Sequence, residues 1–177
     1  MLASATAVVL RGSASAVDLG IQSFSFKDRP FDAMLDACEQ AGSKSIELFS
    51  GHIEQPWDER RSPAGRKRLR DWRIGEGEGY CTEIKRALDR RGFQLNAFNL
   101  TIRNEHTEDE IEATFRMTKA LGTDLLTTSS NVSTAPRIAP FAREHRVCVA
   151  FHNHARIRED EFATPRDFEQ AMEAEPQ

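Results

Sequence analysis

Apolar residues along the chain recur with two periods, and segments of each period alternate. Runs in which every second residue is apolar indicate strands, and apolar residues spaced by three and four positions indicate helices. The expected strands cover residues 18–26, 44–50, 93–102, 124–130 and 146–153. Strands that alternate with helices are typical of βαβ units in a parallel sheet. The pattern therefore predicts an α/β fold.

Residues suited to helix ends divide the same pattern into helices. Pro30 suits a first helical position, and the helix it opens is expected to end at Gly42. Thr107 and Glu110 have the spacing of a capping box, in which each side chain binds a backbone amide at the helix start. Further helices are expected before Gly92, after Thr107, over 138–145 and from Thr164 onward.

The two faces of the expected strands differ in polarity. One face is aliphatic, and the other becomes polar toward the carboxyl end, with Glu47 in the second strand and His152 in the fifth. An open sheet covered on both faces would be almost continuously hydrophobic. A barrel lumen that ends in an active-site mouth has the observed pattern. The faces therefore favour a (β/α)8 TIM-barrel type over an open doubly wound sheet, with only about five βα units present, a partial barrel.

Composition narrows the class of protein. The 177 residues suffice for one domain, and a net charge of −4 argues against a general nucleic-acid binder. No apolar stretch approaches the roughly 20 residues of a membrane span, so we expect no membrane insertion. The three cysteines are odd in number and lack CxxC spacing, so we expect Cys38, Cys81 and Cys148 to be reduced packing residues.

Six short motifs follow one another at the expected strands and helices. They are Leu19-Gly-Ile-Gln-Ser-Phe-Ser-Phe26, Ser45-Ile-Glu-Leu-Phe49 with Gly51-His52, Ala97-Phe-Asn-Leu100, Ala120-Leu-Gly-Thr123, Ala139-Pro-Phe-Ala142 and Val149-Ala-Phe-His-Asn-His154. In order and placement they resemble the xylose-isomerase-like TIM-barrel superfamily, in its sugar phosphate isomerase/epimerase branch. The resemblance implies a partial barrel over 17–177, preceded by a leader over 1–16.

The resemblance implies a metal-assisted isomerase or epimerase that acts on a keto- or aldo-sugar, or an inosose-type polyol, through an enediolate. A divalent ion (Mn, Co, Zn or Mg) would polarise the carbonyl while a carboxylate or histidine removes the adjacent proton. Sugar lyases or dehydratases and endonuclease IV share the fold, so a lyase and, less favoured, a hydrolase of abasic DNA stay open. The substrate would be a small sugar, with no nucleic acid or membrane as partner.

The sequence departs from that superfamily in length. A complete barrel needs eight units and about 250 residues, and family metal ligands usually follow the sixth, seventh and eighth strands. With five units, the chain is expected to lack isomerase turnover by itself, because proton removal and return need groups on both sides of the substrate. An inactive fragment, or one that works only by association, is therefore the alternative.

Candidate site residues follow the expected strand ends. His152 and His154 lie two apart on one strand, so they share a face and are the proposed metal ligands, unless they form a hydrogen-bonded pair in a polar lumen. Glu47, with His154, is the catalytic candidate; its alternative role is a lumen charge paired with a lysine or histidine. His52, Asn99 and Gln22 are expected to bind substrate.

The segment from Trp57 to Gly79 is an insertion, and its stretch from Asp58 to Arg73 carries seven basic and three acidic residues. A basic stretch with tryptophans could bind phosphate or nucleic acid, but a solvated amphipathic helix over the mouth, with the tryptophans beneath it, is favoured. Gly75-Glu-Gly-Glu-Gly79 follows no strand, so we interpret it as a flexible joint and not a dinucleotide loop.

The two ends of the expected fold raise separate questions. Ala3–Leu10 is apolar and Ala14-Ser15-Ala16 resembles a signal-peptidase site, but no basic segment precedes them. We therefore expect a cytoplasmic protein, with export to the periplasm as the alternative. A sheet cut after five strands leaves edges at the first and fifth strands, so a homo-oligomer is expected.

Overall fold

The computed structural model describes residues 19–54 and 62–174. The proposed leader over 1–16, Trp57, Arg60 and Arg61 lie outside the described residues. The described chain forms one five-stranded parallel sheet in the order β1-β2-β3-β4-β5. The strands are β1 (Ile21–Gln22), β2 (Ser45–Phe49), β3 (Gln94–Asn99), β4 (Leu125–Thr128) and β5 (Cys148–Phe151). Parallel neighbours that are also consecutive in sequence confirm the predicted α/β fold of partial TIM-barrel type.

Within the described residues, six α-helices connect these strands or follow the last of them. They are α1 (Phe31–Gln40), α2 (Pro63–Gly75), α3 (Gly77–Arg90), α4 (Glu108–Ala120), α5 (Ala135–His145) and α6 (Pro165–Ala174). The capping box is confirmed: Thr107 accepts from the Glu110 amide, and Glu110 accepts from the Thr107 amide. No described helix is long and apolar enough to cross a membrane.

Two local expectations from the sequence are wrong. The first strand was expected over 18–26, but Ser23–Phe26 is a 3₁₀ helix, because the Gln22 side chain accepts from the Phe24 amide and turns the chain. The expected joint over 75–79 is confined to Glu76, a turn between the end of α2 at Gly75 and the start of α3 at Gly77, and the rest of the range is helical. A Cβ on Gly77 would lie 2.8 Å from Met117 Sδ, so glycine here allows α3 to approach α4 closely.

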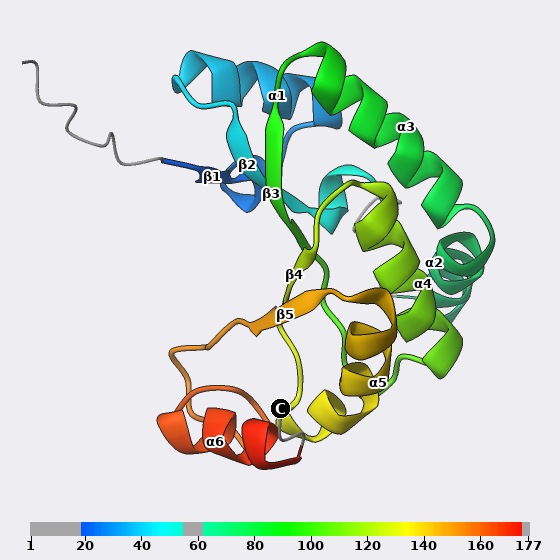
Figure 1. Cartoon of the computed structure of the whole chain (residues 1–177), viewed down its shortest axis with the longest axis vertical. Coiled ribbons are helices and arrows are strands. Elements are labelled where there is room, and N and C mark those ends of the chain that lie inside the picture. Colours follow the sequence, from blue (N-terminus) through cyan, green and yellow to red (C-terminus); the bar gives the residue numbers. More distant parts are fainter. Residues whose placement is uncertain (1–18, 55–61, 175–177) are drawn as a thin grey trace, which may run out of the picture.

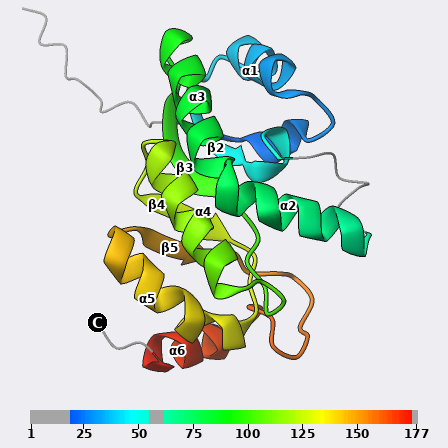
Figure 2. The same ribbon diagram turned by 90° about the vertical axis from the view of Figure 1, so that its right-hand side faces the viewer.

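The helices lie on the outer side of a curved sheet. Figure 1 shows α2, α3, α4 and α5 following the convex side of the sheet, and no described helix covers the concave side. Figure 2, turned by 90°, shows the same helices in front of the strands. The core lies between the two layers and includes Phe98, Phe115, Leu88 and Met34, all fully buried. The concave face is therefore the side on which polar strand residues can meet a ligand.

The three cysteines do not share one environment. Cys38 and Cys81 are buried as expected, and burial raises the pKa of the Cys81 thiol to about 12. Cys148 is exposed, so its expected role as a packing residue is wrong. It lies on the concave face of β5, where no described element packs.

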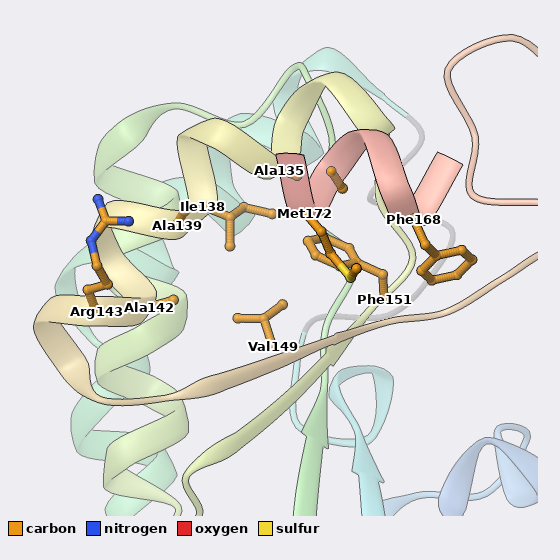
Figure 3. A pocket seen from close by; sticks show the side chains of 10 residues that line it. Ala135, Ile138, Ala139, Ala142, Arg143, Val149, Phe151, Phe168 and Met172 are labelled. Carbon is orange, nitrogen blue, oxygen red and sulfur yellow. The ribbon is translucent and has the colours of Figure 1, made fainter. Parts of the chain in front are cut away.

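The β5 end of the sheet is less densely covered than the rest. Among the described residues β5 pairs only with β4. A cavity of about 440 Å³ lies between β5, α5 and α6. Figure 3 shows its apolar lining, with Val149 and Phe151 facing Ile138 of α5 and Met172 of α6. A second, small core of Val132, Ala135, Phe162 and Ala171 attaches α6 to the rest of the protein.

Candidate functional site

The loops after β3 and β5 enclose a polar cavity at the carboxyl ends of the strands. Its volume is about 650 Å³. Its lining residues are mostly basic or polar: Arg103, His152, Asn153, His154, Ala155, Arg156, Arg158 and Glu161. Active sites of barrel proteins form from the loops at this end of the strands. We therefore take this cavity as the candidate site.

His154 is held at the cavity by two side chains. Its Nδ1 lies 3.3 Å from Glu161 Oε2, and its Nε2 lies 3.3 Å from Ser129 Oγ. Because a carboxylate only accepts, Nδ1 carries the proton toward Glu161 and Nε2 has the lone pair. The hydrogen bond to His154 lowers the pKa of Glu161, and Arg103 and Arg158 lower it further. A carboxylate that orients an imidazole in this way makes Nε2 the basic atom of the ring, and in the structure the Ser129 hydroxyl lies against that atom.

A network centred on Asp160 fixes the loop that carries Glu161. Asp160 accepts from the Ser133 amide and hydroxyl, at 2.7 Å each, and from Asn104 Nδ2 at 3.0 Å. Its backbone has φ 59°, a left-handed conformation that aspartate tolerates better than most residues. Burial acts to raise the pKa of Asp160, but the hydrogen bonds from Ser133 and Asn104 outweigh it and lower the pKa. The β5–α6 loop is thus tied to the loops after β3 and β4.

His152 lies next to His154 but makes fewer side-chain contacts. The two ring centroids are 5.5 Å apart, and the rings are close to perpendicular. The His152 amide continues the ladder by donating to the Thr128 carbonyl, so its side chain lies at the end of β5. The side chain is exposed toward the cavity. The structure therefore brings the two predicted metal ligands together at one strand end.

A second set of hydrogen-bonded polar side chains lies across the concave face of the sheet, closer to the amino ends of the strands. Thr127 Oγ1 donates to Glu47 Oε1 and accepts from Asn99 Nδ2, which lies 2.8 Å away. Asn99 pairs with Thr127 in the sheet register. The three side chains, from β2, β3 and β4, therefore form one chain of hydrogen bonds across the lumen. Ser129, two residues beyond Thr127, makes the contact with His154.

His52 and Gln22 bind the protein's own backbone. His52 Nδ1 lies 3.1 Å from the Arg29 carbonyl, and Nε2 lies 2.9 Å from the Ser23 carbonyl. Both ring nitrogens thus face acceptors, and His52 fastens the loop after β1 to the end of β2. The side-chain oxygen Oε1 of Gln22 accepts from the Phe24 amide at 2.8 Å. Substrate binding by these two residues stays a prediction. In the structure each of the two side chains contacts backbone groups of the protein itself.

A buried ionic cluster lies beside the candidate site, beneath α2. Arg73 Nε lies 2.7 Å from Glu54 Oε1, and Arg73 Nη1 lies 3.8 Å from Glu110 Oε1 and 3.1 Å from His106 Nε2. Because a guanidinium only donates, His106 Nε2 accepts from Arg73, while Nδ1 lies 3.0 Å from the Arg103 amide nitrogen and 3.2 Å from the Arg103 carbonyl oxygen. Burial, and then the charge of Arg73, lower the pKa of His106.

This cluster corrects the expectation for the insertion. The sequence predicted a solvated basic helix, and Arg66, Lys67 and Arg68 of α2 are indeed exposed. Arg73, however, is only 6% exposed and faces inward. Its charge is balanced by two glutamates from separate segments, which removes the cost of burying it alone. Trp72 packs against the core and meets Tyr80 edge to face, with ring centroids 5.7 Å apart.

The divalent ion that the family resemblance implies needs several side-chain ligands at one place. Among residues 19–54 and 62–174, no three His, Cys, Asp or Glu side chains are grouped as a metal site requires. His152 and His154 supply two imidazoles, and Glu161 is already engaged by Arg103 and His154. Two ligands do not complete the tetrahedral or octahedral shells of the expected ions. The described residues alone therefore do not fit a closed metal site.

Five functional side chains of the site were not singled out from the sequence. They are Arg103, Ser129, Arg156, Arg158 and Glu161. Ser129 could have been found, since it follows Thr127 with the two-residue period of one strand face. Arg103 and Glu161 are 58 positions apart and meet only through loop packing, which leaves no local signal.

Comparisons with known proteins support the fold. No protein-family model matches the chain, and no curated protein matches it. A solved structure of an uncharacterised protein from Parabacteroides distasonis is 21% identical over 88% of this chain, with a TM-score of 0.59. The probable 3-DHS dehydratase AsbF, involved in petrobactin synthesis in Bacillus anthracis, is 12% identical over 88% of this chain, with a TM-score of 0.56. The chain spans 56% and 58% of the lengths of these two proteins.

Proposed function

We propose that the carboxyl edge of the sheet binds a keto- or aldo-sugar, or a related polyol, and that His154 moves a proton at the carbon beside its carbonyl. The observation that supports this proposal is the His154–Glu161 pair inside a cavity of about 650 Å³. The family resemblance and the likeness in fold to a probable 3-DHS dehydratase make a sugar isomerase, epimerase or dehydratase the closest reaction class.

The proposed step uses the chain's own residues. Nε2 of His154 takes the proton from the carbon, while Nδ1–H keeps its hydrogen bond to Glu161 and the positive ring is balanced by that carboxylate. The electron pair of the broken C–H bond forms a double bond to the carbonyl carbon, the π pair of the carbonyl moves to its oxygen, and an enediolate results. His152, beside His154, is placed to donate to that oxygen, and the Asn99–Thr127–Glu47 chain supplies groups for the sugar hydroxyls.

Proton exchange with solvent tests this step without requiring complete turnover. In D₂O, the wild-type chain should catalyse loss of the NMR signal of the exchangeable C–H in a panel of ketoses and inososes. His154→Asn and Glu161→Gln should slow that exchange by about 100-fold or more, the usual contribution of a positioned base and its orienting group. No exchange by the wild type with any member of the panel would contradict the proposal.

His145→Asn is the matched control for this experiment. His145 also pairs with a glutamate, with Nε2 2.9 Å from Glu112 Oε2, but on the outer helical layer. The exchange rate of this variant should equal that of the wild type. An equal loss in His145→Asn and His154→Asn would show that the effect comes from general damage to the fold.

Metal binding remains a proposal with its own test. Two imidazoles at one strand end should bind Mn²⁺, Co²⁺ or Zn²⁺ weakly, because too few ligands complete the shell. Titration calorimetry should show this weak affinity in the wild type and its loss in His152→Ala and His154→Ala. Unchanged affinity in both variants would contradict the assignment of these two ligands.

The second candidate function is activity that depends on association. Two observations favour it: the apolar cavity beside β5, and a β5 edge that pairs only with β4 among the described residues. Such edges and patches recruit other chains. We therefore propose a dimer or larger assembly, to be tested by light scattering at micromolar concentration beside thermal unfolding. A monodisperse monomer with a concentration-independent transition would contradict it.

A further inference from the structure

The side chains that line the candidate site include more arginines than carboxylates. Three arginines, Arg103, Arg156 and Arg158, line the cavity against one glutamate, Glu161. The two other acidic residues of this loop, Glu159 and Asp160, do not line the cavity, so the lining itself has two more arginines than carboxylates. The whole chain has a net charge of −4, so this excess is local and does not follow from a basic protein surface.

The single glutamate of the cavity is already committed. Glu161 Oε1 lies 3.5 Å from Arg103 Nη1, and Glu161 Oε2 lies 3.3 Å from His154 Nδ1. Among the described residues, the side chains of Arg156 and Arg158 form no hydrogen bond or ion pair, and both are exposed; the charge of Arg158 acts on Glu161 only at longer range and lowers its pKa. Their guanidinium groups are therefore available to an external anion.

The loop that carries these arginines is fixed at one end by other elements. Asp160, two residues after Arg158, is hydrogen-bonded to Ser133 and Asn104. At the other end, His154 donates its backbone amide to the Phe162 carbonyl at 2.8 Å. The segment from His154 to Phe162 is thus closed on itself, which fixes the backbone that carries both arginines. Fixed positions reduce the entropy lost when a ligand binds.

The neighbouring cluster around Arg73 shows that excess charge is not a general property of this edge. There Arg73 is paired with two carboxylates of the protein, those of Glu54 and Glu110. The guanidinium groups of Arg156 and Arg158, in contrast, form no ion pair among the described residues and line a cavity beside His154. Guanidinium groups bind carboxylate and phosphate oxygens with paired, charge-assisted hydrogen bonds.

We propose that the ligand of this cavity carries an anionic group, a carboxylate or a phosphate, which is bound by Arg156 and Arg158 while its carbonyl carbon chain reaches His154. This inference rests on the proposed function and names the class of its substrate: an acidic sugar or polyol. A cavity of about 650 Å³ accommodates a six-carbon acid or a sugar phosphate, since small-ligand pockets range from roughly 300 to 1,000 Å³.

Matched pairs of ligands test the proposal. Binding of glucuronate against glucose, and of ribose 5-phosphate against ribose, is measured by NMR titration of the 177-residue chain at low ionic strength. At least one charged ligand of a pair should bind about tenfold or more tightly than its neutral partner. That preference should decrease as salt is added, because screening weakens exposed charge pairs. The stronger of the two preferences identifies the anion as carboxylate or phosphate.

Two double variants separate a specific site from general charge. Arg156→Gln with Arg158→Gln should abolish the preference for the charged ligand. Arg86→Gln with Arg90→Gln is the control, because it removes the same charge from exposed positions on α3. The control should keep the preference. Equal losses in both double variants would overturn the proposal, since only net charge would then matter.

The outcomes also separate this inference from the proposed function. If neutral and charged sugars bind equally and His154→Asn still slows proton exchange, the anionic substrate is overturned and the proposed function stands. If the charged ligands bind through Arg156 and Arg158 but no proton exchange occurs, the anion site stands and the proposed chemistry is overturned. If no sugar of either kind binds, both are overturned.

Discussion

Two clusters of arginine, glutamate and histidine lie on either side of the β3–α4 loop, and they differ in burial and in charge balance. His106 of this loop belongs to the cluster of Arg73, and Arg103, three residues earlier, belongs to the cluster of Glu161. The side chains of Arg73 and Glu54 are 6% and 0% exposed. Those of Arg103 and Glu161 are 25% and 15% exposed.

This difference separates a structural role from a binding role. Buried charges must be paired, and removing one partner is costly because the other charge remains in a medium of low polarity. Partly exposed pairs contribute little to stability, since water and salt screen them. The Arg73 cluster therefore fixes α2 and the β3–α4 loop. The Glu161 cluster lines the polar cavity, and ligand binding is its proposed role.

The largest expected effect is on stability, in the buried cluster. Arg73→Ala leaves Glu54 and Glu110 without their cation, so it should lower the free energy of unfolding by about 3–5 kcal/mol. Urea unfolding monitored by circular dichroism measures this. Replacing Glu54 as well, in Arg73→Met with Glu54→Leu, should restore much of the loss. A double variant less stable than Arg73→Ala would contradict the view that unpaired charge causes the effect.

More of the fold than of the candidate site could be predicted from the sequence, for a physical reason. Strand and helix periods are local, so the βαβ order, the capping box at Thr107 and the polar face that includes Glu47 could be predicted. Burial of Arg73 could not, because it depends on Glu54 and Glu110 arriving from other segments. The same holds for Glu161, which reaches His154 through a loop whose shape depends on Asp160.

A smaller effect is expected at Glu110, which belongs to both the capping box and the buried cluster. Its Oε2 accepts from the Thr107 amide at 3.2 Å, and its Oε1 faces Arg73. Glu110→Ala loses both contacts and should cost about 1–3 kcal/mol, the range for a lost cap and an unsatisfied buried group. Glu110→Gln keeps the reach to Thr107 and should cost less. Equal losses in thermal unfolding would show that charge, and not capping, dominates here.

The pH dependence of stability tests the same cluster with a more modest effect. Because burial and Arg73 lower the pKa of His106 below its ordinary value near 6.5, the unfolded chain binds this proton more readily than the folded one. Stability should therefore be complete above pH 6.5 and fall as the pH drops below it. Urea midpoints between pH 7.5 and 5.5 measure the slope. His106→Gln should reduce that slope, since it removes the group that titrates while Glu105 and Glu110, which also act on the ring, stay in place.

The smallest effect on stability is expected at the partly exposed Glu161 cluster. A change at Glu161 tests most directly whether the Glu161 and Arg73 clusters have different roles. Glu161→Gln removes the carboxylate from Arg103 and His154, yet both partners remain in contact with water at the cavity. Its urea midpoint should therefore lie within the scatter of repeated wild-type measurements, far from the shift of Arg73→Ala. The same variant should lose proton exchange, because Nδ1 of His154 no longer has a charged acceptor. A variant that unfolds as early as Arg73→Ala would mean that Glu161 holds the β5–α6 loop in place, and the two clusters would then share a structural role.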